Sequence, residues 1–194
     1  MQFSSNSIYH VYNRGNNKQR IFLQEKNYDF FLRKLSIELK GLCDLLAYCL
    51  MPNHFHLLIY INEKSPGLSL LPQQGQQVLV RKIGTLLSSF SQAINKQENS
   101  IGSLFQQKTK SKLLDTNHYA LACFNYIHQN PMKAGLASKL EDWRYSSFRA
   151  YLEKDSSLCN LDLASELIEI HREKDLFYSE SYSAIDDSLV NQIF

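Results

Sequence analysis

The stretch that decides the fold is DLLAYCLMPNHFHLLIYI, residues 44–61. Its first part, residues 44–50, is an apolar run of the length and kind that is typical of a buried strand. Met51-Pro52-Asn53 then supplies a short turn, and residues 54–61 return as a second strand. The sequence therefore predicts a tight β-hairpin in the first half of the chain.

Outside this hairpin, apolar residues recur with the spacing of strands or of helices. Gly41 supplies a stop for the helix that precedes the hairpin. Thr116 is suited to begin the last helix of this region as its N-cap, and Pro131 is expected to prevent that helix from continuing. In chain order, the predicted elements are a strand at 8–13, a helix at 25–40, the hairpin, a helix at 78–96, a strand at 103–114 and a helix from 117 to about 129.

The resulting order, β-α-β-β-α-β followed by a further helix, predicts an α+β fold of the ferredoxin-like type. In that fold, one antiparallel sheet carries both crossover helices on the same face. The rest of the chain gives weaker signals. Residues 63–77 are rich in Pro, Gly and Gln and predict a mobile loop, residues 161–173 have helical periodicity, and the last twenty residues are expected to be irregular.

The distribution of charge is more informative than the net charge of +2. Residues 1–135 contain 15 Lys/Arg and 7 Asp/Glu, a balance of +8, whereas residues 136–194 contain 6 and 12, a balance of −6. A basic body with an acidic C-terminal segment suits a polyanionic ligand. Charge alone leaves open whether these side chains bind nucleic acid or only solvate the surface.

The four cysteines show neither a CxxC pair nor a regular spacing, so we expect neither a disulfide framework nor a structural zinc site. No apolar run approaches the length of a membrane helix, and residues 1–7 lack the basic flank and apolar stretch of a signal peptide. We therefore expect reduced thiols in a cytoplasmic protein.

His54 and His56 are the residues most informative about chemistry. Residues two apart in a strand share a face, so the two imidazoles lie on one side, about 7 Å apart along the strand. Two such rings can converge on one metal ion if they tilt together. Phe55, Leu57 and Ile59 point to the opposite face, which we assign to the helix-covered core. The pattern alone is also compatible with two exposed or hydrogen-bonded histidines.

A third metal ligand and a nucleophile must come from another element. Tyr126 and Asn130 lie four residues apart in the helix that follows Thr116, so they share one helical face. The amide oxygen of Asn130 would complete a two-histidine site without adding charge, and Gln129 is a rival ligand. The chain has 11 tyrosines, so packing is the ordinary alternative role for Tyr126.

Five short blocks of the sequence together resemble the single-tyrosine HUH transposases, and most of all the branch of REP-associated tyrosine transposases. No single block is specific, but all of them occur in the family's order between residues 8 and 151. The blocks are YHVYNRG (9–15), MPNHFH (51–56), LFQQK (104–108), YIHQNPMKAGL (126–136) and WRYSS (143–147).

The resemblance implies a ferredoxin-like core whose sheet presents His54 and His56 beside the helix that bears the nucleophile Tyr126. It implies an enzyme that cleaves and rejoins single-stranded or hairpin DNA through a 5′-phosphotyrosine, with Mg or Mn held by the two histidines and Asn130. The chain departs from insertion-sequence relatives, which usually have Gln where Asn130 stands. REP-associated relatives tend to be monomers, so we expect a monomer, although a homodimer is possible.

The same resemblance predicts a catalytic domain over residues 1–150, and an acidic C-terminal extension over 151–194 whose role it leaves open. For contacts to DNA we name phosphate-binding cations and tyrosines that could stack on unpaired bases. Each has an ordinary alternative, since lysines on an edge strand deter aggregation and aromatic residues fill cores. The cations are Arg14, Lys108, Lys110 and Lys112, and the tyrosines are Tyr9, Tyr12 and Tyr119.

Two other functions remain open at this point. A domesticated, non-catalytic protein that binds nucleic-acid hairpins would use the same charges and aromatic residues. A metal-dependent hydrolase would use the histidine pair to activate water, and would leave Tyr126 without a role. The presence of all four residues of the expected site, His54, His56, Tyr126 and Asn130, favours the transposase.

Overall fold

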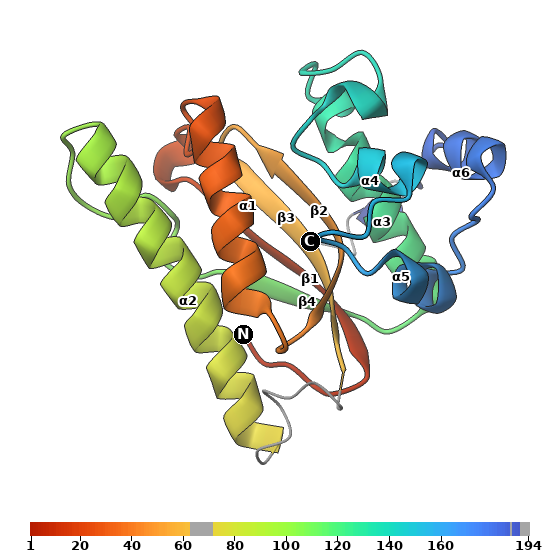
Figure 1. The fold of residues 1–194 in the computed structure, drawn as a ribbon, viewed down its shortest axis with the longest axis horizontal. Coiled ribbons are helices and arrows are strands. Elements are labelled where there is room, and N and C mark those ends of the chain that lie inside the picture. The colour runs from red at the N-terminus through yellow and green to blue at the C-terminus, as the bar shows by residue number, and fades with distance from the viewer. Residues whose placement is uncertain (63–71, 187, 191–194) are drawn as a thin grey trace.

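A four-stranded antiparallel sheet with helices on both faces forms the centre of the computed structural model (Figure 1). The structure describes residues 1–62, 72–186 and 188–190. The sheet order is β2-β3-β1-β4, and every neighbouring pair is antiparallel, so the ferredoxin-like prediction is confirmed. The main elements are β1 (Ser7–Arg14), α1 (Glu25–Leu39), β2 (Asp44–Met51), β3 (His54–Ile61), α2 (Pro72–Gln97), β4 (Lys110–Leu114) and α3 (Asn117–Lys133).

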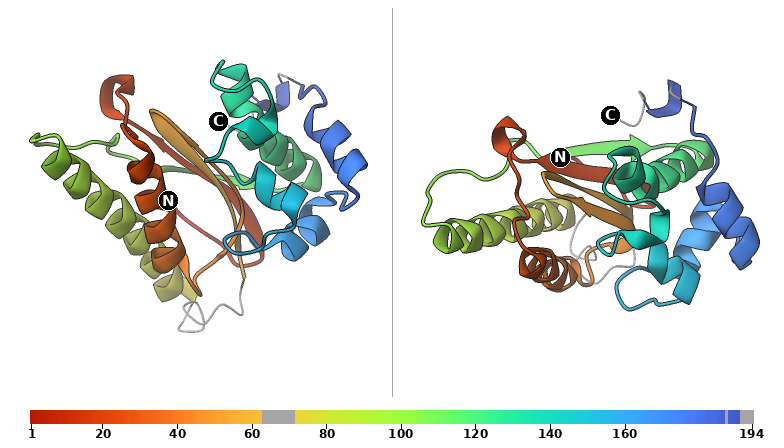
Figure 2. Two further views of the ribbon diagram at one scale, coloured as in Figure 1. Left: turned by 45° about the horizontal axis from the view of Figure 1, so that its top comes forward. Right: turned by 90° about the horizontal axis from the view of Figure 1, so that it is seen from above.

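The two faces of the sheet are covered by different helices (Figure 2). Helices α1 and α2 pack on one face, and α3 lies on the other with the helices that follow it. The alternation along β3 assigns its side chains to these faces: Phe55, Leu57 and Ile59 belong to the hydrophobic cluster under α1 and α2, whereas Leu58 belongs to the cluster under α3. The predicted orientation of β3 is therefore confirmed.

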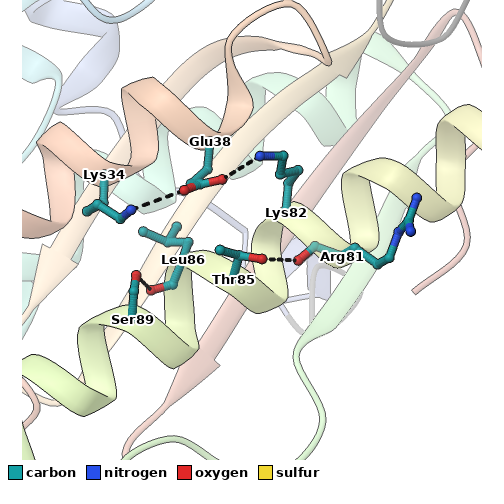
Figure 3. Close-up of polar contacts among 7 residues, drawn as sticks. All are labelled: Lys34, Glu38, Arg81, Lys82, Thr85, Leu86 and Ser89. Carbon is teal, nitrogen blue, oxygen red and sulfur yellow. Dashed lines mark hydrogen bonds and ion pairs between the residues drawn. The ribbon is translucent and has the colours of Figure 1, made fainter.

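Contacts between α1 and α2 combine this apolar packing with polar bridges, one from Asn27 Nδ2 to Gln97 Oε1 at 2.9 Å and one at Glu38 (Figure 3). The carboxylate of Glu38 on α1 accepts from Lys34 Nζ at 3.1 Å, one turn earlier, and from Lys82 Nζ on α2 at 3.0 Å. These two hydrogen bonds hold the pKa of Glu38 below its usual range. Glu38 thereby links the two crossover helices. The hydrophobic cluster under α1 and α2 is called the first cluster below, and the one under α3 the second cluster.

The outer edge of β2 is covered by a later part of the chain. Leu50 N donates to Tyr145 O at 2.9 Å, and Ser147 N donates to Tyr48 O at 3.0 Å. Asn160 N donates to Leu45 O at 2.8 Å. Because these bonds occupy backbone groups of β2, the edge is not left open for another strand.

The C-terminal part contains more helix than expected. A short 3-10 turn (Leu140–Asp142) leads to helices α4 (Phe148–Glu153), α5 (Leu161–Ile168) and α6 (Lys174–Ser181). The predicted helical stretch 161–173 ends early, because Glu169 takes a left-handed conformation with φ of 60°. The expectation of an irregular final twenty residues is wrong for α6, whose Phe177 is buried among aromatic residues of α4.

Those C-terminal helices share their core with α3. Ala164, Ile168 and Phe177 belong to the same hydrophobic cluster as Phe124 and Ile127 of α3. The expected boundary at residue 150 falls inside α4.

The boundaries of two elements differ from the prediction. Of the predicted loop 63–77, residues 63–71 lie outside the described residues, and 72–77 form the start of α2. Pro72 is favourable there, because the first turn of a helix has no partner for the N–H that proline lacks. Helix α3 continues through Pro131 to Lys133, and does not stop before the proline. The helix ends shortly after Pro131, and Leu136 N donates to Pro131 O at 2.9 Å. Because proline lacks only its own N–H, one intrahelical hydrogen bond near the end of the helix is lost.

Strand β4 is shorter than the predicted strand 103–114. Pairing with β1 ends at Tyr12 and Lys110, because the next residue of β1, Asn13, uses its side chain in place of backbone pairing. Asn13 Nδ2 donates to Thr109 Oγ1 at 2.9 Å and to Gln106 O at 3.1 Å. Lys108 therefore precedes β4, whereas the sequence predicted it within the strand.

Candidate active site

Side chains from β1, β3, β4, α3, the segment before β4 and the C-terminal part of the chain line a pocket of about 320 Å³. The pocket opens on the face of the sheet that carries α3, and it brings together residues more than seventy positions apart in the chain. Its lining residues are Tyr12, Asn13, Arg14, His54, His56, Gln106, Lys108, Lys110, Tyr126 and Val190.

His54 is half-buried at the start of β3, directly opposite Arg14 of β1. Its Nδ1 lies 2.5 Å from Asn53 Oδ1, while the amide nitrogen of Asn53 donates to Lys18 O at 3.3 Å. An amide oxygen only accepts, so Nδ1 of His54 carries the proton and Nε2 keeps its lone pair. Burial, and then the charge of Arg14, lowers the pKa of His54 to about 4, so the ring is neutral at pH 7.

His56 is almost fully buried, with its ring centroid 4.9 Å from that of His54. Its Nδ1 lies 2.8 Å from His10 Nε2, and its Nε2 lies 3.0 Å from Asn130 Nδ2. Burial is the main reason that the pKa of His56 is well below the usual value. The two histidines thus share a face as predicted, and both are neutral, which is the state that ligates metals.

Tyr126 faces the histidine pair from α3. Its ring centroid lies 5.8 Å from that of His56 with the planes at 85°, and Lys133 Nζ lies 5.7 Å from the centroid of the Tyr126 ring. Burial raises the pKa of the Tyr126 phenol, and the nearby charge of Arg14 acts in the opposite direction. The hydroxyl is therefore protonated at neutral pH, and its ionisation depends on positive charge in the pocket.

The donor set fits a divalent ion. Two neutral imidazoles that are each held through Nδ1 leave Nε2 of His54 and His56 as ligands. In the described part of the chain, no group of three or more His, Cys, Asp or Glu side chains could hold a metal. Asn130 lies beside His56 and can supply a third ligand if its amide turns to present Oδ1 in place of Nδ2. The metal itself stays a prediction.

Four of the seven expected DNA-contacting residues lie in this pocket, namely Arg14, Lys108, Lys110 and Tyr12. Arg14 and the two lysines are exposed, and Lys110 Nζ lies 5.7 Å from the centroid of the Tyr12 ring. A polyanion entering the pocket would meet these charges beside the Tyr126 hydroxyl.

The other three expected contacts lie elsewhere. Tyr9 is 5% exposed in the first cluster, with its ring edge-on to Phe3 and its hydroxyl accepting from Ser4 N, so the prediction that it stacks on bases is wrong. It faces the opposite side of β1 from Tyr12, as alternation requires. Lys112 is exposed on β4 but does not line the pocket. Tyr119 is half-buried two turns before Tyr126 and packs against the second cluster.

Three residues of the site were not given a role from the sequence. His10 contacts His56, while Asn13 and Gln106 line the pocket. All three fall within the sequence blocks that carry the family resemblance, and that was the available signal. Gln129, the rival ligand, faces away from the pocket: its Nε2 donates to the carbonyl oxygens of Ser181 and Ser183 at 2.8 and 2.9 Å.

Two features bear on the expected cellular location. All four cysteines are free, and three of them are buried. Within the described residues, no helix combines the length and apolarity that a membrane span requires. A cytoplasmic location remains a prediction.

A ferredoxin-like sheet with two histidines facing a helical tyrosine is the arrangement that the resemblance implied. No family model matches the chain. A Haemophilus influenzae protein named "Putative REP-associated tyrosine transposase" is 25% identical over 105 residues, which are 54% of this chain and 58% of that protein. The chain thus matches less than two thirds of that relative's length.

A solved structure of a REP-associated tyrosine transposase bound to a REP hairpin has the same fold. It aligns with a TM-score of 0.58 over 84% of this chain and 87% of the other, at 15% identity. The resemblance seen in the sequence blocks is confirmed by both comparisons: this chain is similar to REP-associated tyrosine transposases in sequence over about half its length, and in fold over most of it.

Proposed function

We propose that this protein is a REP-associated tyrosine transposase, which cleaves and rejoins single-stranded or hairpin DNA through a 5′-phosphotyrosine on Tyr126. The observation that carries the proposal is that His54, His56 and Tyr126 line one pocket beside exposed cations, with Asn130 Nδ2 3.0 Å from His56 Nε2. Each of these residues has an ordinary structural alternative, but packing alone does not require all four to converge.

DNA is the proposed partner on two grounds. Residues 1–135 carry a balance of +8, and three of their cations surround the pocket. The structural relative was solved with a REP hairpin bound. An accessible strand suits a single tyrosine, which can hold only one strand end at a time. We propose that the protein binds and cleaves DNA as a monomer.

In the proposed mechanism, Nε2 of His54, Nε2 of His56 and the amide oxygen of Asn130 would hold a Mg or Mn ion. When bound, such an ion supplies Lewis acidity to the scissile phosphate and its leaving oxygen. Arg14 and the lysines neutralise the phosphate and orient it toward Tyr126.

Tyr126 Oη attacks phosphorus as the bond to the 3′ oxygen breaks. The phenol loses its proton, and the leaving 3′ oxygen gains one, so the products are a 5′-phosphotyrosine and a 3′-OH. Attack by another 3′-OH on this linkage reverses the bond changes and releases Tyr126. The linkage conserves the phosphodiester energy, so rejoining requires no nucleotide triphosphate.

The test uses hairpin oligonucleotides with single-stranded flanks, labelled at either end, with Mg or Mn. The intact protein should cut one strand and retain the 3′ portion of DNA covalently after denaturation. Tyr126→Phe should still bind DNA but lose cleavage and adduct together. Tyr119→Phe, on the same helix but outside the pocket, is the matched control and should keep both.

The other outcomes separate the rival functions. A water-activating hydrolase would still cut as Tyr126→Phe and would give no adduct. A non-catalytic hairpin binder would give no cleavage with either protein. Loss of the adduct in Tyr119→Phe but not in Tyr126→Phe would show that the nucleophile is misassigned.

A further inference from the structure

His10 lies beside the proposed site but does not line its pocket. Its side chain is fully buried on β1, two residues before Tyr12 and on the same face. It stacks on Tyr12 with ring centroids 4.6 Å apart, and its Nε2 lies 2.8 Å from His56 Nδ1. His56 therefore sits between two polar partners, His10 at Nδ1 and Asn130 at Nε2.

The chemistry of imidazole limits how these contacts can be made. A neutral ring carries one N–H, so one nitrogen donates and the other accepts. Asn130 Nδ2 can only donate, so at 3.0 Å it requires an unprotonated Nε2 on His56. His56 Nδ1 then carries the proton and donates to His10 Nε2. With the opposite tautomer, Nε2 would carry a proton and could not bind a metal.

Occupation of the site would remove the contribution of Asn130 to this choice. If Asn130 turns its oxygen toward a metal, its amide nitrogen no longer donates to His56. The hydrogen bond from His56 Nδ1 to His10 Nε2 would remain, and it would still favour the same tautomer of His56. His54 has an equivalent partner in Asn53, whose amide oxygen accepts from Nδ1. Each histidine of the pair thus has its own acceptor behind it.

We propose that His10 is a positioning residue, which accepts a hydrogen bond from His56 Nδ1 and so holds His56 in the tautomer and orientation that present Nε2 to a divalent metal. This inference rests on the proposed function, because it assigns His56 as a ligand. A carboxylate is a common partner for a ligating histidine. Here the acceptor is an uncharged ring that is fully buried, and that choice adds no buried charge.

The first experiment reads the tautomer directly in metal-free protein. With ¹⁵N-labelled histidine, two-bond ¹H–¹⁵N spectra distinguish a protonated Nδ1 from a protonated Nε2 in His56. We expect protonated Nδ1 in the natural protein and a shift toward protonated Nε2 in His10→Phe, which keeps a ring but removes the acceptor. A natural protein with His56 protonated at Nε2 would overturn the inference without any variant.

The second experiment measures Mn²⁺ affinity from the electron paramagnetic resonance signal of free Mn²⁺. His10→Phe should weaken binding by about 10- to 100-fold, the usual effect of losing the partner of a ligating histidine. His10→Gln, whose side-chain oxygen can accept from the same nitrogen, should recover most of the affinity. Equal weakening by Phe and Gln would show that only the shape of the imidazole matters, and would overturn the inference.

These readouts also separate this inference from the proposed function. If the natural protein binds Mn²⁺ and His56 has the expected tautomer, but no DNA adduct forms, then the proposed function fails and the role of His10 stands. If the adduct forms and His10→Phe changes neither tautomer nor affinity, the role of His10 fails and the function stands.

Discussion

The two faces of the sheet bury different kinds of side chain. The face under α1 and α2, called the first face, is filled by large aromatic and aliphatic residues, such as Phe22, Phe31 and Phe90. The face under α3, called the second face, combines apolar residues, many of them small, with buried polar groups that include His10 and His56. The same strands supply both faces by alternation. One face therefore mainly supports the fold, and the other also carries the groups proposed for chemistry.

Burying polar groups is costly unless they are hydrogen-bonded. On the second face several buried polar groups are paired, although His128 Nδ1 has no hydrogen-bond partner. His56 contacts His10 and Asn130, and Gln129 reaches two carbonyl oxygens near the end of α6. These contacts join β1, β3, α3 and the C-terminal segment. The second face is thus held by directed contacts, whereas the first depends on close packing.

The sharpest test of this comparison uses neighbouring residues on opposite faces. Phe55→Ala removes a fully buried ring from the first face and should lower the free energy of unfolding by about 3–5 kcal/mol. His54→Ala removes a half-buried ligand and should change stability by about 1 kcal/mol or less, while reducing cleavage by at least about 100-fold. Chemical denaturation and cleavage rates per folded molecule measure the two effects. A similar loss of cleavage rate in both folded variants would break the distinction.

How far the sequence predicts each face differs for a physical reason. Alternation along β3 predicts that His54 and His56 oppose Phe55, and helical spacing predicts that Tyr126 and Asn130 share a face. Both rules are local. The role of His10 could not be predicted from them, because it depends on the register between β1 and β3 and on which way each ring turns.

The other differences between prediction and structure also arise from contacts between residues that are distant in the sequence. Tyr9 and Tyr12 are both tyrosines in one strand, and only knowledge of which face meets α1 and α2 separates the core residue from the pocket residue. Strand β4 begins later than predicted, at Lys110, just after the point where the Asn13 side chain donates to Thr109 Oγ1. Helix α6 forms where Phe177 packs against Phe148 and Tyr151 of α4.

Acid should weaken the second face more than the first. His128 on α3 is fully buried against Ser147, and burial lowers its pKa to about 3. In the unfolded chain His128 binds a proton near pH 6.5, whereas in the folded protein it does so only near pH 3. The free energy of unfolding therefore falls as the pH drops through this range. From pH 6.5 to 4, this one residue should account for a loss of about 3 kcal/mol.

His128→Gln should remove that part of the pH dependence, because the amide does not titrate. Denaturation curves at half-unit intervals from pH 7 to 4 would measure it in both proteins. Parallel curves for the two proteins would show that His128 does not cause the sensitivity.

Gly15 tests how closely β1 is packed where it leaves the site. A Cβ on Gly15 would lie 2.3 Å from Gln19 O and 2.9 Å from Ile21 Cγ2, so backbone must move. Gly15→Ala should lower the free energy of unfolding by about 1–3 kcal/mol and displace the adjacent Arg14. Gly84→Ala, on an exposed part of α2 with no atom within 4 Å, should be stabilising by about 0.5–1 kcal/mol. Thermal unfolding of both variants checks the contrast, which would fail if the two shifts had the same sign.

The smallest expected effect concerns the polar bridge at Glu38. Glu38→Gln removes the charge that holds Lys34 and Lys82, and should lower the free energy of unfolding by about 1 kcal/mol at pH 7, because both lysines are partly exposed. The lowered pKa of Glu38 means that its contribution is present at neutral pH and is lost as the pH falls below about 4.5. Urea denaturation should therefore show a smaller difference between the two proteins at pH 3 than at pH 7. Glu25→Gln, in an exposed pair with Arg144, is the control and should change nothing measurable.

The most direct test of the whole account is to locate the DNA on the protein. After reaction with a hairpin and Mn²⁺, the complex would be digested with nuclease and protease, and the modified peptide sequenced by mass spectrometry. The account predicts a nucleotide linked through its 5′ phosphate to Tyr126, the residue facing His56 in the pocket. A nucleotide on any other residue, or cleaved DNA with no modified peptide, would contradict it.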